Sequence, residues 1–306
     1  MKARAVTNRL PSASLPESTS LHPHANRATM HSLVSTQWLA EQSGSPDLVI
    51  LDASAHLPDS PRNSAADFSE GHIPDARFLD LTSFVDTASQ VPKAVPTADQ
   101  FARRLGQLGI TPSSRVVLYD DSQIKSAARA WFIFRLYGFR NVAILDGGFS
   151  RWKQEERPIE AGRATYEQTE FPTPSVAGAV RGKDQMLAND SSRAEQIVDA
   201  RDAARFAGEE GSGSEGHIPG AANLHFAKLF AEDGTYRSPD NITALFAESG
   251  VELDGPVTTY CNSGMTACVL AFGLHLAGKD DVALYDGSWL EWGEDADTPK
   301  EKGAAQ

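Results

Sequence analysis

Short runs of consecutive apolar residues alternate with amphipathic stretches along most of the chain. The runs at 48–52 and 115–119 have the length and continuous apolar character of buried strands. Between them, residues 98–108 carry apolar side chains at helical spacing, with Thr97 as an N-cap and Gly109 as a stop signal. Strands that alternate with helices predict an α/β fold with a parallel sheet covered by helices on both faces.

The same landmarks occur twice in the same order, about 140–147 residues apart. Gly-His-Ile-Pro-x-Ala occupies residues 71–76 and 216–221. A strand-like run ending in Asp-Ala precedes each copy, and a run ending in Tyr follows it. An Asp-Gly turn comes next, with a tryptophan six residues after the aspartate, at Trp152 and Trp292. This separation is too long for a solenoid unit, so the repeat predicts two tandem domains.

The repeat and the composition around it suggest the domain boundaries. We expect a disordered tail over residues 1–30, a first domain over 31–155, a linker over 156–178 and a second domain over 179–306. The linker has several prolines and glycines and little periodicity, which is typical of a surface segment. The tail is basic and rich in serine and proline. We expect a cytoplasmic protein, or a mitochondrial one if residues 1–29 act as a transit peptide.

Composition narrows the class of protein. The chain has 306 residues, 41% hydrophobic and 23% charged, which is ordinary for a soluble globular protein. A net charge of −13 argues against a partner that is a nucleic acid or an anionic membrane. The chain has no run of about 18 apolar residues, so the sequence predicts no membrane-spanning helix. The two cysteines are too few for a disulfide framework or a zinc site, so we expect a reducing compartment and no metal.

One cysteine stands where a strand joins a helix. The run 257–260 leads into Cys261-Asn-Ser-Gly-Met-Thr-Ala267, and a helical pattern follows. The amide groups of such a loop can form an anion cradle that favours the nucleophilic thiolate. Cys261 is therefore a candidate covalent catalyst, the alternative being a small buried residue without chemistry. Cys268 is expected inside the helix and unreactive. The first half has Asp120 at the matching position, so we expect only the second half to be catalytic.

These motifs resemble those of the two-domain sulfurtransferases of the rhodanese family. The resemblance covers roughly residues 32–295 and rests on the doubled Gly-His-Ile-Pro, on Cys-x-Ser-Gly-x-Thr-Ala and on the motif from Tyr285 to Gly293. It is strongest to members that use 3-mercaptopyruvate. Members that use thiosulfate typically carry basic residues after the cysteine, where this chain has the neutral Asn262 and Ser263. The mercaptopyruvate loop is Cys-Gly-Ser-Gly-Val-Thr-Ala, so Asn262 and Met265 are departures from it.

The resemblance implies a role for each site residue. Cys261 would take the sulfur of 3-mercaptopyruvate as a persulfide and pass it to cyanide or to a thiol such as thioredoxin, without a metal or organic cofactor. Ser263 and His72 are implied to be catalytic, with His72 facing the cleft between the domains. Arg201 and Arg205 are implied to hold the carboxylate and ketone of the substrate. The other implied substrate-binding residues are Asn262, Gly264, Met265 and Thr266.

Several alternatives stay open from the sequence. His217 occupies the same motif as His72, so at least one of the two histidines is expected to be structural. The acidic partner of the family corresponds to Asn63, so a Cys-His-Asp triad is not carried over. The chain could instead be a thiosulfate sulfurtransferase or a non-catalytic binding module. A cysteine phosphatase on the same fold would need an arginine six residues after the cysteine, where this chain has Ala267.

Overall fold

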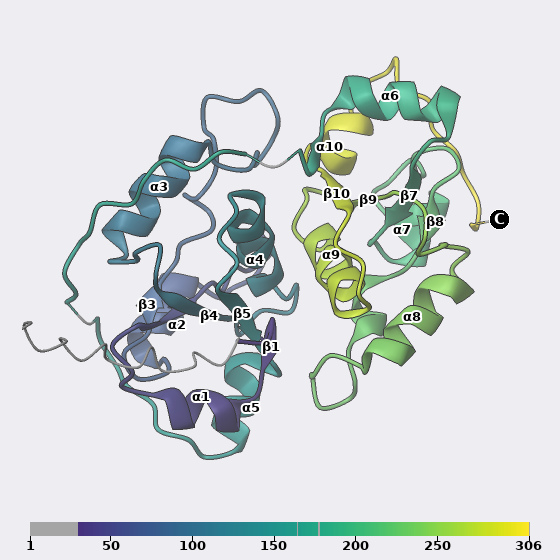
Figure 1. Ribbon diagram of the computed structural model, residues 1–306. Helices are drawn as coiled ribbons and strands as arrows, with labels where there is room; N and C mark the ends of the chain where they lie inside the picture. The colour runs from purple at the N-terminus through teal and green to yellow at the C-terminus, as the bar shows by residue number, and fades with distance from the viewer. Residues whose placement is uncertain (1–29, 164, 177, 306) are drawn as a thin grey trace, which may run out of the picture.

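Two parallel five-stranded sheets form the framework, one in each half of the chain (Figure 1). The computed structural model describes residues 30–163, 165–176 and 178–305. Residues 1–29 of the tail for which we predict disorder lie outside the described residues. The strand order is β1-β5-β4-β2-β3 in the first sheet and β6-β10-β9-β7-β8 in the second. The two copies of the repeat therefore share one topology, as the sequence predicts.

The strands are short, as expected for buried parallel strands. Those of the first sheet are β1 (Leu33–Val34), β2 (Leu48–Asp52), β3 (Arg77–Phe78), β4 (Arg115–Tyr119) and β5 (Val142–Leu145). Those of the second sheet are β6 (Val180–Arg181), β7 (Gln196–Asp199), β8 (Ala222–Asn223), β9 (Val257–Tyr260) and β10 (Val282–Tyr285). In the second sheet β9 is central, between β10 and β7, so the chain that follows it leaves from the middle of the sheet.

Helices connect the strands in both halves. The first half contains α1 (Thr36–Gln42), α2 (Ser64–Glu70), α3 (Ala98–Gln107), α4 (Ala127–Leu136) and α5 (Gly148–Gln154). The second half contains α6 (Lys183–Ser192), α7 (Ala203–Ala207), a 3₁₀ turn η1 (Phe226–Leu229), α8 (Pro239–Glu248), α9 (Ala267–Leu276) and α10 (Ser288–Trp292). Helix α8 begins at Pro239, because Ser238 caps it and the proline occupies its first turn. That turn is polar and exposed, so apolar periodicity does not reveal it.

The inner faces of the two sheets share one core. The cluster contains residues of α3 and α4 from the first half and of α8 and α9 from the second. Figure 1 shows α4 and α9 between the two sheets. At their contact the ring of Trp131 meets that of Phe272 edge-on, with the centroids 4.8 Å apart. Separate clusters cover the outer faces, under α1, α2 and α5 in one half and α6, α7 and α10 in the other.

The segment expected to be a linker runs along the first half. Thr169 donates its backbone N–H to Gly106 in α3, and Gly162 donates to Ser69 in α2. Glu160 exchanges both backbone hydrogen bonds with His72. The segment therefore follows the surface of the first half before it enters the second. Within the described residues, no helix has the length and apolar character needed to cross a membrane.

Candidate active site

Cys261 lies at the carboxyl end of β9, the central strand of the second sheet. Ligand sites in parallel sheets form at these strand ends. The following loop runs to residue 266, and α9 begins at Ala267. The start of α10 holds this loop in place: Trp289 donates its backbone N–H to the Cys261 carbonyl at 3.0 Å, and Leu290 donates to Asn262 at 2.9 Å. The Cys261 N–H donates to the Ser288 hydroxyl at 3.3 Å.

The amide groups of the loop are available to an anion. For the backbone N–H groups of residues 262–266, no acceptor is found within the described part of the chain. The matching loop of the first half shows what such amides bind. There Asp120 takes the place of Cys261, and its carboxylate accepts hydrogen bonds from Ser122 N at 3.0 Å and Ala127 N at 2.8 Å. The first half thus holds a carboxyl group with backbone N–H groups of its own loop and of the start of α4.

An arginine from the first half supports the Cys261 loop. Arg129 of α4 donates to the Asp286 carboxylate at 2.8 Å and also reaches the carbonyl oxygen of Gly264 at 3.4 Å. Gly264 has a φ of +75°, and a Cβ at this position would lie 2.9 Å from the Arg129 guanidinium. Glycine is therefore required here both by the backbone conformation and by the close approach of the arginine.

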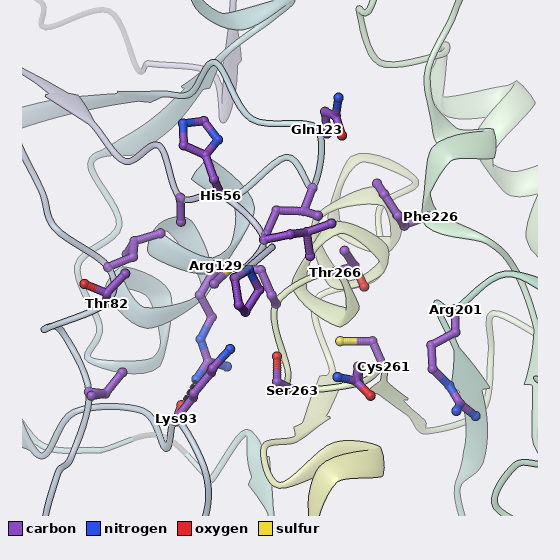
Figure 2. Close-up of a pocket in the computed structure, with 18 of the residues that line it drawn as sticks. His56, Thr82, Lys93, Gln123, Arg129, Arg201, Phe226, Cys261, Ser263 and Thr266 are labelled. Atoms are coloured by element: carbon purple, nitrogen blue, oxygen red, sulfur yellow. Dashed lines mark hydrogen bonds between the residues drawn. The ribbon is translucent and has the colours of Figure 1, made fainter. Parts of the chain in front are cut away.

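A pocket of about 420 Å³ opens in front of Cys261, and both halves line it. Figure 2 shows the cysteine sulfur, Ser263 and Thr266 on one side and side chains of the first half, among them Lys93 and Arg129, on the other. The predicted site residues that the structure brings together here are Arg201, Arg205, Cys261, Asn262, Ser263, Met265 and Thr266. Gly264 belongs to the same loop but is not part of the pocket lining; it shapes the loop.

The two predicted substrate-binding arginines differ in their exposure to solvent and in their hydrogen-bond partners. Arg201 is 1% exposed and makes several hydrogen bonds to the fully buried carboxylate of Asp199, the shortest at 2.6 Å. It also donates to Ser214 and to the Gly216 carbonyl. Burial opposes its charge, but Asp199 outweighs this and raises the pKa of Arg201. Arg205 is partly exposed, and within the described part of the chain its one ion pair is with Asp202 at 2.6 Å.

His72 does not face the pocket, which corrects the expectation from the sequence. Its side chain is fully buried, its Nδ1 is hydrogen-bonded to the Phe68 carbonyl at 2.8 Å, and its ring stacks on Phe68. His217 has the same arrangement with Phe206. Both histidines of the repeated motif therefore connect a helix end to the segment that follows it, and the sequence identity of the two motifs reflects this shared packing.

The first half places another histidine at the pocket. His56 lines the pocket wall, and its Nε2 lies 2.9 Å from the Asp67 carboxylate. Asn63, at the position of the family's acidic residue, caps α2 by accepting from Ala66 N at 3.0 Å. Sequence reasoning missed His56, Lys93 and Arg129, because all three lie outside the repeated motifs and reach the site only through the packing of the two halves.

Cys268 lies inside α9, as predicted. It is fully buried, and its Sγ donates to the Gly264 carbonyl at 3.1 Å. Burial raises the pKa of this thiol to about 12, although the nearby Arg129 acts in the opposite direction. At neutral pH Cys268 is thus a protonated, enclosed thiol, and Cys261 is the cysteine that lines the pocket.

Comparison with known proteins agrees with this geometry. The rhodanese-like domain family matches residues 35–155 and again residues 183–295. The chain belongs to the rhodanese family. 3-Mercaptopyruvate sulfurtransferase of Mus musculus is 41% identical over 270 residues, which cover 85% of this chain and 91% of that protein. Thiosulfate sulfurtransferase of Cricetulus griseus is 38% identical over 271 residues, with the same shares covered.

A solved structure shares the whole two-domain rhodanese arrangement. The crystal structure of SseA from Escherichia coli, described as a 3-mercaptopyruvate sulfotransferase with the rhodanese fold, matches with a TM-score of 0.78 and 34% identity. The match covers 85% of this chain and 99% of SseA. The two tandem sheets described above are therefore two rhodanese domains.

Replacing Arg201 or Arg205 in this rhodanese site should lower the free energy of unfolding by clearly different amounts. Arg201→Met leaves the buried Asp199 carboxylate without its counter-ion, which should lower the free energy of unfolding by about 3–5 kcal/mol. Arg205→Met removes a partly exposed ion pair and should cost at most about 1 kcal/mol. Denaturant unfolding followed by circular dichroism measures both values. Equal losses for the two variants would show that the burial of Arg201 does not set its role.

Proposed function

We propose that the chain transfers the sulfur of 3-mercaptopyruvate to a thiol or cyanide through a persulfide on Cys261. The observation that carries the proposal is the loop around this cysteine. Its amide groups have no acceptor within the described residues, and the matching first-half loop binds the Asp120 carboxylate through its own amides. A thiolate or persulfide on Cys261 would receive the same stabilisation. The names of the similar enzymes are consistent with this chemistry.

In the first step the Cys261 thiolate attacks the sulfur of the donor. The new S–S bond forms as the C–S bond of mercaptopyruvate breaks, and the electron pair of that bond passes to the methylene carbon, so pyruvate leaves as its enolate. A proton from the sulfhydryl end of the persulfide then converts the enolate into pyruvate. The Ser263 hydroxyl, which lines the pocket beside Cys261, is our candidate for relaying this proton.

We assign the grip on the donor to Arg205 in the first place. Arg205 lines the pocket, and among the described residues its guanidinium is engaged only by the partly exposed Asp202, so it can turn to a substrate carboxylate. Arg201 contributes positive charge to the pocket wall, while most of its N–H groups donate hydrogen bonds to Asp199, Ser214 and Gly216. The open rim of the pocket is formed by Asn262, Met265 and Thr266.

In the second step an acceptor removes the outer sulfur. A thiolate or cyanide attacks that atom, the S–S bond breaks, and its electron pair returns to Cys261 as the thiolate. We propose a small thiol or a protein thiol such as thioredoxin as the acceptor and a cytoplasmic location. Both proposals follow from composition and resemblance alone.

Cys261→Ser should abolish sulfur transfer to cyanide, while Cys268→Ser should keep most of it, because only Cys261 lines the pocket. Intact-mass analysis after incubation with 3-mercaptopyruvate should show one added sulfur atom on the unaltered chain and on Cys268→Ser. The addition should be lost on treatment with a thiol. Peptide mapping that places the sulfur on Cys268 would refute the assignment.

3-Mercaptopyruvate should be preferred over thiosulfate in kcat/KM. Asn262 and Ser263 give the loop no charge-assisted contacts to a second negative charge on the donor. Such contacts are worth about 1.5–3 kcal/mol each, which is roughly tenfold or more in kcat/KM. Steady-state rates of thiocyanate formation from cyanide with either donor measure the ratio. A ratio near one, or a preference for thiosulfate, would favour the alternative activity of thiosulfate sulfurtransferase.

A further inference from the structure

One cation on the pocket wall is not paired with any residue that the structure describes. The charged lysine and arginine side chains that line the pocket are Lys93, Arg129, Arg201 and Arg205. Each arginine has an acidic partner, at 2.8 Å for Arg129 and 2.6 Å for the other two. Lys93 forms no ion pair or side-chain hydrogen bond with any residue that the structure describes, and its side chain is exposed. The free positive charge in the pocket therefore comes from the first half.

The backbone of Lys93 is held in a fixed position beside the site. Its φ of +55° lies in the left-handed region, which lysine adopts only at a cost. The Lys93 carbonyl accepts a hydrogen bond from Arg129 at 3.0 Å, and the same arginine supports the loop at Gly264. Figure 2 shows Lys93 next to the Arg129 guanidinium, at the side of the pocket opposite the Cys261 loop. Arg129 thus sets the position of Lys93 relative to the reacting cysteine.

We propose that Lys93 binds the anionic group of the sulfur donor and is a specificity-determining residue of the pocket. This inference rests on the proposed function and adds to the contact assigned to Arg205 a second cation, from the first domain, for the carboxylate of the donor. The ligand class is a small carboxylate whose sulfur faces Cys261. An ammonium on a flexible side chain recognises such an anion as a point charge, without a fixed two-pronged geometry. Asn262 and Ser263 are neutral, so these two loop residues provide no positive charge that could bind the anion in place of Lys93.

The proposal has a structural consequence. The second half supplies the nucleophile and Arg205, whereas the first half supplies the unpaired cation. A donor would therefore contact both domains at once, which gives the first domain a part in binding although Asp120 occupies its own cysteine position.

Alkylation of Cys261 tests the charge without relying on sulfur transfer. Iodoacetate is anionic and iodoacetamide is neutral, so the ratio of their rates reports the local positive charge and cancels differences in thiol reactivity. Lys93→Met should lower the iodoacetate-to-iodoacetamide ratio by about twofold to fivefold, the range for an exposed ion pair. Lys125→Met is the matched control, because Lys125 has a similar φ of +52° and belongs to the first half, but its ammonium lies over the Phe230 ring outside this pocket. The control should leave the ratio unchanged.

Steady-state kinetics then tests the same residue with the donor. Lys93→Met should raise KM for 3-mercaptopyruvate by a similar factor with little change in kcat, and Lys93→Arg should restore it. An unchanged alkylation ratio in Lys93→Met, an equal drop in Lys125→Met, or a loss confined to kcat would overturn the proposal. If the unaltered chain shows no sulfur transfer while the alkylation ratio still falls in Lys93→Met, the proposed function fails and the anion-binding role of Lys93 stands.

Discussion

The ion pair between Arg129 and Asp286 joins the first domain to the catalytic loop of the second. The two side chains are 5% and 7% exposed, and their charged atoms lie 2.8 Å apart. Burial opposes the charge on Arg129, but Asp286 outweighs this and raises the pKa of the arginine. Asp286 also accepts from Val95 N at 2.6 Å, and the turn it begins leads into α10, which holds the carbonyls of Cys261 and Asn262. Removing either partner would leave a buried charge unpaired at the base of the site.

The two domains are copies with different tasks. In the first, the Asp120 carboxylate occupies the cradle permanently, and burial raises the pKa of this group. In the second, Cys261 leaves the backbone N–H groups of residues 262–266 without an acceptor among the described residues, so they are available to the sulfur anion of the proposed reaction. The two loops therefore differ at one position: in the first domain the carboxyl group of Asp120 accepts hydrogen bonds from the backbone, and in the second domain Cys261 stands at that position. The first domain remains part of the site because α4 brings Arg129 to the interface and the turn before α3 brings Lys93.

The repeated motifs predicted the two sheets, their shared topology and the loop that carries Cys261, because each of these depends on short stretches of sequence. The roles of individual charged residues depend on which partners they contact in the folded protein, and the sequence does not identify those partners. Asp199 lies only two residues before Arg201, yet nothing in the sequence shows that both are buried together. The contact between Arg129 and Asp286 spans 157 residues and exists only after the domains pack. His72 misled the prediction because the motif that marks it encodes packing on Phe68.

The central claim is that a charge from the first domain holds the catalytic loop in the geometry that forms the persulfide. Its most direct test is the single-turnover rate of persulfide formation on Cys261 in Arg129→Met, Asp286→Asn and the double variant, with folding checked by circular dichroism. We predict that each single variant slows the reaction and that the double variant is no slower than the worse single one, because the pair acts as one unit with a coupling of about 0.5–3 kcal/mol. Unchanged rates in the folded single variants, or losses that simply add in the double variant, would contradict the claim.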